Sequence, residues 1–226
     1  MNWHIPKMWN EGECWIIGGG TSLAKQFEIP QQVINNVKEG KTNLNSYSPY
    51  LSQLHDKKVI GVNAAYKLGN WVEVAFFGDT KFFDQNENSL RIFPNLIISC
   101  ITKPVSWRNQ RAGVKILKRN QNSGLTDVSS HVCWNHNSGA AAVNLAVHFG
   151  VKRIYLLGFD MKKDSNKETH WHGEYTNKLR DNVFSRHLKG WPSIKRDANK
   201  MGVEIINVNP DSAIKEFKKV DLKEVL

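Results

Sequence analysis

The chain has 226 residues, which is enough for one α/β domain with a full core and too few to expect two ordinary enzyme domains. Hydrophobic residues make up 40% of it and charged residues 23%, so the composition excludes a mainly disordered protein. The formal net charge of +10 favours a polyanionic partner such as nucleic acid, an acidic glycan or a nucleotide phosphate, without choosing among them.

The three cysteines, Cys14, Cys100 and Cys133, are spaced too widely for a disulfide framework or a zinc knuckle. This cysteine usage predicts a reducing, cytoplasmic setting. The N-terminal stretch MNWHIPKMWNEGE lacks the apolar segment of a signal peptide. No apolar run reaches the length that is needed to cross a bilayer, so we expect no membrane span.

Short apolar runs bounded by turn residues recur along the chain and predict β-strands. Several are continuously apolar rather than alternating, which is typical of strands buried on both faces of a mostly parallel sheet. We therefore expect a single Rossmann-like α/β domain over residues 1–226, with helices flanking the sheet. The predicted strands are residues 14–17, 58–62, 72–77, 96–101, 114–118, 153–157 and 203–208.

Two helices stand out in the second half of the chain. The stretch NSGAAAVNLAVHFG predicts a helix that Asn137 or Ser138 caps and that Gly150 ends. The strand at 153–157 follows at once, as in the second half of a right-handed crossover unit. After the last predicted strand, the stretch NPDSAIKEF predicts a final amphipathic helix that begins at Pro-Asp-Ser.

Two regions depart from this regular plan. Residues 101–135 mix short strand-like pieces with polar turns. Residues 161–200 are polar and basic and are interrupted by Gly and Pro. Insertions of that length usually carry function or mobility, so we interpret residues 161–200 as a lid-like insertion within the single domain.

A glycine-rich loop, GGGTSL, follows the first predicted strand. It lacks the dinucleotide fingerprint, because Leu23 stands where the third glycine belongs and the second strand ends in Asn63 rather than in an acid. It also lacks the Gly-Lys-Ser/Thr ending of a P-loop. What remains is either an anion site made of backbone N–H groups and two hydroxyls at a helix start, or a tight turn that binds no ligand.

Small and polar residues also follow the other predicted strands. In an open parallel sheet, ligands bind beyond the carboxyl ends of the strands, so these residues should line one pocket. A second helix start, at Asn137, would add further N–H groups for a phosphate. The predicted pocket residues are Gly18, Gly19, Gly20, Thr21, Ser22, Asn63, Gly78, Asp79, Asn137, Ser138, Gly139, Gly158 and Asp160.

Six landmarks stand in order along the chain: IIGGGTSL, VNAAY, AFFGDTKFF, NSGAAAVNLAVHFGVKRIYLLGFDM, THWHG and VEIINVNPDSAI. In their order and spacing the chain resembles the bacterial lipooligosaccharide sialyltransferases. It also resembles the wider superfamily of often phage-borne proteins related to them, and the archaeal-type hydroxymethyl-dihydropterin pyrophosphokinases. The landmarks run from Cys14 to Ile214, and the block around NSGAAA and GFD is the most specific of them.

The resemblance implies an enzyme that transfers a sugar from a nucleotide donor, with a CMP-sugar as the first expectation and no required cofactor. The glycine loop and Asn63 would hold the cytidine monophosphate part of the donor. His170 in THWHG is the best match to the family's general base. The rest of the nucleotide pocket would be Ser138, Gly139, Gly158 and Asp160.

The chain departs from the family pattern at two places. The family's asparagine after the third strand is replaced by Gly78 and Asp79, which brings a carboxylate near the phosphates. The tyrosine that helps to neutralise the leaving phosphate falls at Lys162, which keeps a donor but puts the identity of the nucleotide sugar in doubt. Tyr175, from the same insertion, is a replacement donor.

The sequence leaves other functions open. A pyrophosphokinase-like enzyme would need magnesium, for which Asp79 or Asp160 are the candidate ligands. The net charge also suits a nucleic-acid-binding protein without catalysis, or sugar transfer onto nucleic acid rather than onto a glycan. His170 and His172 share a face if extended, but nothing near them completes a zinc spacing, so we predict no metal site there.

Overall fold

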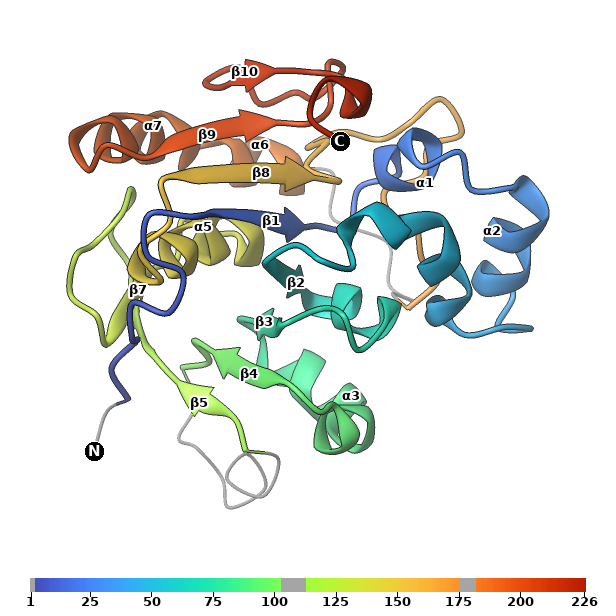
Figure 1. The fold of residues 1–226 in the computed structure, drawn as a ribbon, viewed down its shortest axis with the longest axis horizontal. Coiled ribbons are helices and arrows are strands. Elements are labelled where there is room, and N and C mark those ends of the chain that lie inside the picture. The colour runs from blue at the N-terminus through green and yellow to red at the C-terminus, as the bar shows by residue number, and fades with distance from the viewer. Residues whose placement is uncertain (1–2, 103–112, 175–181) are drawn as a thin grey trace.

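Eight parallel strands form one sheet in the computed structural model, which describes residues 3–102, 113–174 and 182–226. Their order is β10-β9-β8-β1-β2-β3-β4-β5, and Figure 1 shows β1 near the middle of the sheet. The sheet confirms the predicted α/β, Rossmann-like architecture. Its strands are β1 (Glu13–Ile17), β2 (Val59–Val62), β3 (Val74–Phe77), β4 (Leu96–Ser99), β5 (Lys115–Ile116), β8 (Arg153–Leu157), β9 (Glu204–Asn207) and β10 (Lys218–Lys219).

The central strand β1 is buried on both faces, as its unbroken apolar run predicts. Trp15 and Ile17 face one hydrophobic core, and Cys14 and Ile16 face the other. Successive side chains along a strand point to opposite faces of the sheet. A strand that is covered by helices on both faces therefore needs an apolar residue at every position.

Two layers of helices cover the sheet. Leucine, tyrosine and phenylalanine side chains from the elements on one face join the core that contains Trp15. The other face is covered by two helices and by an N-terminal segment that inserts Ile5 and Trp9. The first layer comprises α1 (Ser22–Gln26), α2 (Gln31–Lys38), η1 (Leu44–Leu54), η2 (Asn63–Leu68) and α3 (Thr80–Ile92), and the second comprises α5 (Ser138–His148) and α7 (Trp191–Lys200).

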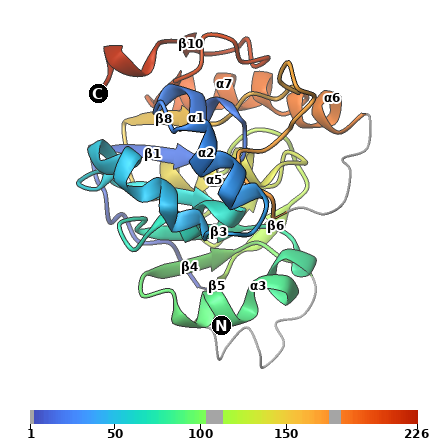
Figure 2. The same cartoon turned by 90° about the vertical axis from the view of Figure 1, so that its right-hand side faces the viewer.

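Figures 1 and 2 place α3, β4 and β5 at one edge of the sheet and β10 at the other. A two-stranded parallel sheet of β6 (Lys118–Asn120) and β7 (His131–Cys133) lies apart from the main sheet. The short helix α6 (Val183–Leu188) precedes α7, and a last turn, η3 (Leu222–Glu224), closes the chain. No helix among the described residues has both the length and the apolar character to cross a membrane.

The helix predicted after NSG is confirmed, with Asn137 as its N-cap. The Asn137 Oδ1 accepts hydrogen bonds from the backbone N–H groups of Gly139 and Ala140, at 2.8 and 3.4 Å. The helix ends at His148, and Gly150 then takes a positive φ of 91°. Ten of its eleven residues are buried, so small side chains are needed for it to lie flat on the sheet.

The predicted final helix is wrong. Residues 209–217 form turns instead, and they lead into β10. Polar groups of this segment bond to the end of β8, because the Ser212 hydroxyl donates to the Phe159 carbonyl and the Ala213 N–H donates to the Asp160 carbonyl. The Ser212 side chain also accepts the Ile214 N–H. These bonds satisfy the backbone locally and outweigh the helical pattern.

Two further predictions need adjustment. The strand expected at 114–118 is divided, because β5 joins the main sheet while β6 begins the small one. Within residues 161–200, α7 buries Trp191, Ile194 and Ala198 in the second core. That part of the segment covers the sheet, and the role of the remainder as a lid stays a prediction.

Candidate functional site

A cavity of about 660 Å³ opens at the carboxyl ends of the central strands. The chain builds the sheet outward from β1 through β5 and then returns to β8, beside β1, to build the other half. Loops leaving β1 and β8 therefore diverge, and this switch point is where open parallel sheets bind ligands. The volume lies within the range of small-molecule sites in proteins.

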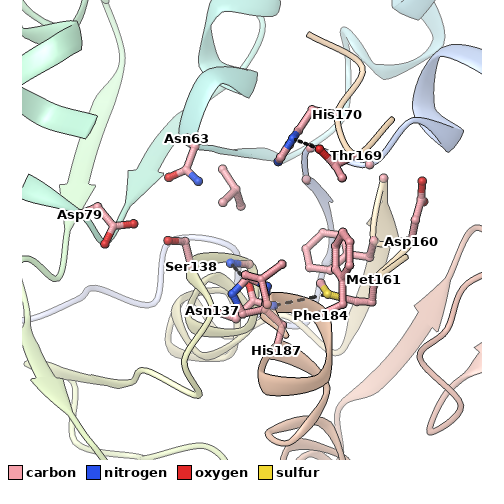
Figure 3. A pocket seen from close by; sticks show the side chains of 18 of the residues that line it. Asn63, Asp79, Asn137, Ser138, Asp160, Met161, Thr169, His170, Phe184 and His187 are labelled. Atoms are coloured by element: carbon pink, nitrogen blue, oxygen red, sulfur yellow. Dashed lines mark hydrogen bonds between the residues drawn. The ribbon is translucent and has the colours of Figure 1, made fainter. Parts of the chain in front are cut away.

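Most of the residues predicted from the strand ends line this cavity (Figure 3). Thr21, Ser22 and Gly78 do not, and Tyr175 lies outside the described residues. Residues predicted from six separate segments of the chain therefore lie around one cavity. The predicted residues on the wall are Gly18, Gly19, Gly20, Asn63, Asp79, Asn137, Ser138, Gly139, Gly158, Asp160, Lys162 and His170.

The Asp160 carboxylate accepts hydrogen bonds from the residues at the end of the glycine loop. It accepts the Ser22 backbone N–H at 2.9 Å, the Ser22 hydroxyl, and the Asn209 side-chain N–H at 2.8 Å, with the Thr21 hydroxyl at 3.5 Å. An ideal Cβ on Gly20 would stand 2.5 Å from the Asp160 carboxyl carbon. Asp160 thus occupies the N–H and hydroxyl groups at the start of α1 where the sequence predicts a bound anion.

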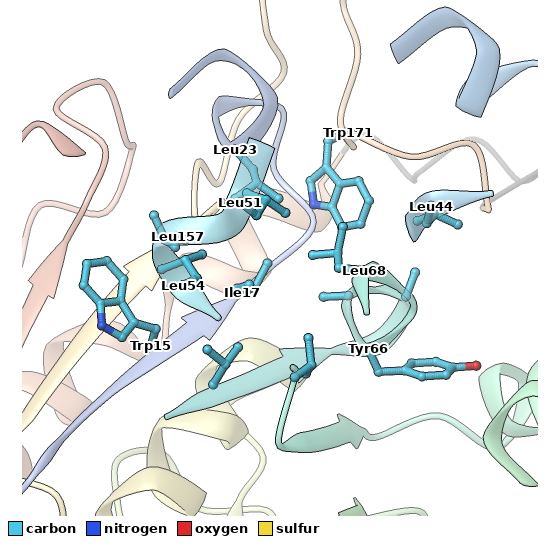
Figure 4. Packing of buried hydrophobic residues seen from close by; sticks show 14 of the residues in the cluster. Trp15, Ile17, Leu23, Leu44, Leu51, Leu54, Tyr66, Leu68, Leu157 and Trp171 are labelled. Carbon is cyan, nitrogen blue, oxygen red and sulfur yellow. The ribbon is translucent and has the colours of Figure 1, made fainter. Parts of the chain in front are cut away.

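Trp171 fastens the THWHG segment to the same loop. Its indole Nε1–H donates to the Gly18 carbonyl at 2.8 Å, and its backbone N–H donates to the Gly19 carbonyl at 3.0 Å. The ring is fully buried among Leu23, Leu51 and Leu68 (Figure 4). Trp171 therefore packs in the core and anchors the loop, and its ring does not face the cavity.

His170 lies directly over the loop that Trp171 fastens. An ideal Cβ on Gly19 would be 2.6 Å from the His170 Cδ2, so only glycine allows the imidazole this approach. The Thr169 Oγ1 lies 2.8 Å from its Nδ1 and orients the ring. In Figure 3, His170 stands on one side of the cavity, with Asn137, Ser138 and His187 opposite.

Three cavity histidines are neutral at pH 7. Burial, and to a smaller degree the nearby His187, lower the pKa of His170 from 6.5 to about 4. Burial also brings the pKa of His187 to about 4, helped by Arg186 and His136. The pKa of His172 is held well below 6.5 by burial first, then by His170, Lys67 and Lys38. Each imidazole can therefore accept a proton in the resting protein.

Trp134 lines the cavity near the end of β3. The Arg119 guanidinium lies 3.7 Å from the centroid of the Trp134 ring, and Arg119 is itself fixed by bonds to the Gly78 and Cys100 carbonyls. An ideal Cβ on Gly78 would overlap the Trp134 ring. Gly78 thus serves packing rather than the cavity wall. Asp79, the next residue, does line the cavity.

Several wall residues escaped the sequence reasoning. Some come from the first turns of α3, beyond the strand-end positions Gly78 and Asp79, and others come from α6, which lies within the predicted insertion. The helical i, i+4 spacing of Lys81 and Gln85 was the available signal for α3. For α6 no signal stood out within the polar insertion. The missed residues include Lys81, Phe82 and Gln85 of α3, Val183, Phe184 and Arg186 of α6, and Met161 after β8.

Within the described parts of the chain, no three His, Cys, Asp or Glu side chains are grouped so as to hold a metal ion. The Asp160 oxygens already accept hydrogen bonds from Ser22 and Asn209. A magnesium ion bound through Asp79 stays a prediction.

Among known proteins, the chain resembles solved structures in its fold. No protein-family model and no curated protein matches the sequence. Solved structures that resemble it include the MAf glycosyltransferase from Magnetospirillum magneticum AMB-1, with a TM-score of 0.59 and 10% identity over 100% of this chain and 36% of that one. This chain has a glycosyltransferase-like fold. It spans about a third of the MAf protein's length.

The sialyltransferase CstII from Campylobacter jejuni, solved with cytidine-5'-monophosphate, has the same fold. Its TM-score is 0.51, with 12% identity over 93% of this chain and 85% of that one. The resemblance to sialyltransferases seen in the sequence is thus matched at the level of the fold. The phage-borne relatives stay a prediction.

Proposed function

We propose that the protein is a glycosyltransferase that binds a nucleotide-activated sugar in this cavity and transfers the sugar to an acceptor hydroxyl. The observation that carries the proposal is a neutral histidine, His170, held over the glycine loop at the switch point of a glycosyltransferase-like fold. A CMP-sugar is the first donor to test, because the sequence landmarks resemble those of sialyltransferases and CstII was solved with CMP.

In the proposed reaction, the acceptor oxygen attacks the anomeric carbon while the bond from that carbon to the donor phosphate oxygen breaks. His170 takes the acceptor proton, and the neutral state that burial imposes is the one that a base needs. An anionic donor beside the imidazole would raise its pKa and so strengthen it as a base. Lys162 and Arg186 line the cavity and would stabilise the leaving phosphate.

The test begins with nucleotide binding and ends with transfer. Thermal shifts with CMP, UDP, GDP and ATP, each with and without magnesium, identify the nucleotide. Release of that nucleotide from its sugar donor then measures turnover. We expect His170→Gln to lower turnover by about 100-fold or more, the usual contribution of a general base, while nucleotide affinity stays within a few-fold of the original.

His4→Gln is the matched control, because His4 is exposed and lies outside the cavity. Absence of binding by every nucleotide would refute the proposal. Full turnover by His170→Gln would refute the assigned base. Strict dependence on magnesium would point instead to a pyrophosphokinase-like reaction, and binding only to nucleic acid, weakening steeply with salt, would point to a non-catalytic role.

A further inference from the structure

The two ends of the cavity differ in chemistry, and this difference bears on the sugar that the proposed donor carries. The cavity runs along the carboxyl edge of the sheet from β8, across β1 and β2, to β3. Three strand spacings separate its ends, about 14 Å. Figure 3 shows Asn63 and Asp79 on one side and Met161 and Phe184 on the other, with His170 between them.

The β8 end is apolar and cationic. Met161, Val183 and Phe184 supply apolar and aromatic surface, and Lys162 and Arg186 supply positive charge. Flat aromatic and thioether groups suit the face of a nucleobase, and the cations suit the phosphate attached to it. The nucleotide half of a donor therefore fits this end.

The β3 end presents hydrogen-bond acceptors. The Asn63 Oδ1 is buried and has no hydrogen-bond partner among the described residues, at a position with a positive φ of 53°. Asp79 is the N-cap residue of α3, yet its side chain makes no hydrogen bond to the first turn of that helix. Its exposed carboxylate lines the cavity instead. The Asp79 carboxylate can accept hydrogen bonds from hydroxyl groups but not from another carboxylate.

The local charges are balanced rather than positive. Lys81 is the nearby cation on the wall, and Asp79 stands two residues before it. Arg119 lies behind Trp134, where the Gly78 and Cys100 carbonyls and the indole face engage it. The remaining polar group on α3, Gln85, is uncharged. A carboxylate on the donor sugar would be repelled by the Asp79 carboxylate at this end, because the described residues nearby carry no net positive charge to offset the repulsion.

We propose, on the basis of the proposed function, that the β3 end of the cavity is a subsite for the donor sugar and that Asp79 makes it selective for a neutral, hydroxyl-bearing sugar over a carboxylate-bearing one. The Asp79 carboxylate accepts hydrogen bonds from sugar hydroxyls, and Asn63 lines the wall beside it. This selectivity departs from a sialic-acid-type donor, in which the transferred sugar is acidic.

The experiment compares donors that share a nucleotide and differ in one carboxylate. Calorimetric dissociation constants are measured for UDP-glucose and UDP-glucuronate, and for GDP-mannose and GDP-mannuronate. CMP-N-acetylneuraminate, which has no neutral partner in this set, is titrated into the unmodified protein and into Asp79→Asn, and the substitution should tighten its binding by about tenfold. Each pair is titrated into the unmodified protein, Asp79→Asn and the control Asp84→Asn. Asp84 lies on the same helix, is exposed and does not line the cavity.

For the base that binds, we expect the acidic sugar to weaken affinity by about tenfold relative to its partner, the effect of one uncompensated like-charge contact. Asp79→Asn should remove most of that difference, and Asp84→Asn should leave it unchanged. Equal or tighter binding of the acidic sugar, or a difference that Asp79→Asn does not alter, would overturn the subsite while nucleotide binding still supported the proposed function. Failure of every nucleotide to bind would overturn both.

Discussion

The contact between Gly19 and His170 gives the imidazole its environment. The ring lies so close over the loop that no side chain fits at Gly19, and this closeness removes water from it. Desolvation disfavours the imidazolium, which is why the pKa of His170 falls to about 4. The absence of a side chain at Gly19 thus contributes to the low pKa of the His170 imidazole.

This environment predicts the pH dependence of the reaction. Protonated His170 cannot accept a proton, so kcat/KM should fall only as the pH drops through about 4. Between pH 5 and pH 8 we expect no acid limb from this residue, because kcat/KM reports the free enzyme. The measurement is donor turnover at subsaturating concentration over that range. A limb near 6.5, the ordinary value for histidine, would show that His170 is solvated or is not the base.

At the scale of elements, the loops after β1 and β8 form one unit with the THWHG segment. Asp160 ties the start of α1 to the end of β8, and Trp171 ties His170 to the carbonyls of the glycine loop. Tyr47, in η1, donates its hydroxyl to the Trp171 carbonyl at 2.9 Å and closes the unit from the helical layer. Three segments distant in sequence therefore position one imidazole.

Trp171→Phe tests this unit. The change leaves the buried Gly18 carbonyl without its donor and leaves space beside it, so we expect a loss of about 2–4 kcal/mol in the free energy of unfolding. Turnover should fall as well, because His170 is the preceding residue. Tyr47→Phe removes one bond from the same segment and keeps the ring, so its loss should be nearer 1 kcal/mol. Urea unfolding measures both, and similar losses would argue against the indole bond as the main anchor.

Local sequence signals predicted the elements that local interactions determine. The N-cap at Asn137 and the unbroken apolar run of β1 are contained in a few neighbouring residues, and both were confirmed. The final helix failed because Ser212 and Ala213 bond to residues some 50 positions earlier. Contacts between distant segments are not encoded in periodicity, and the same reason hid α6 from the predicted site.

At the scale of the whole molecule, the parallel sheet explains why strand-end residues could be assigned to one cavity before the structure was known. Parallel strands place all their carboxyl ends on one edge, so the assignment needed only the strand boundaries. The strand boundaries could not show which of these side chains form hydrogen bonds within the protein. Thr21 and Ser22 bond to Asp160, whereas the Asn63 Oδ1 has no partner among the described residues and the Asp79 side chain makes no hydrogen bond to the first turn of α3.

The buried histidines also make the stability of the whole fold depend on pH. The pKa values of His170 and His187 are lowered to about 4 and that of His172 is held well below 6.5, whereas in the unfolded chain each returns to 6.5. Between these values the unfolded chain binds more protons, so stability is complete above about 6.5 and is lost as the pH falls towards 4. The limiting slope is about 1.4 kcal/mol per pH unit for each histidine.

Urea unfolding at pH 7.5, 6.0 and 5.0 measures this loss. His187→Asn should reduce the slope, because one of the three groups is removed, whereas His4→Gln, on the exposed surface, should preserve it. An anionic nucleotide bound in the cavity should also flatten the dependence, because it favours the protonated imidazoles that burial disfavours. A free energy of unfolding that is constant from pH 7.5 to 5.0 would show that these histidines are hydrated in solution.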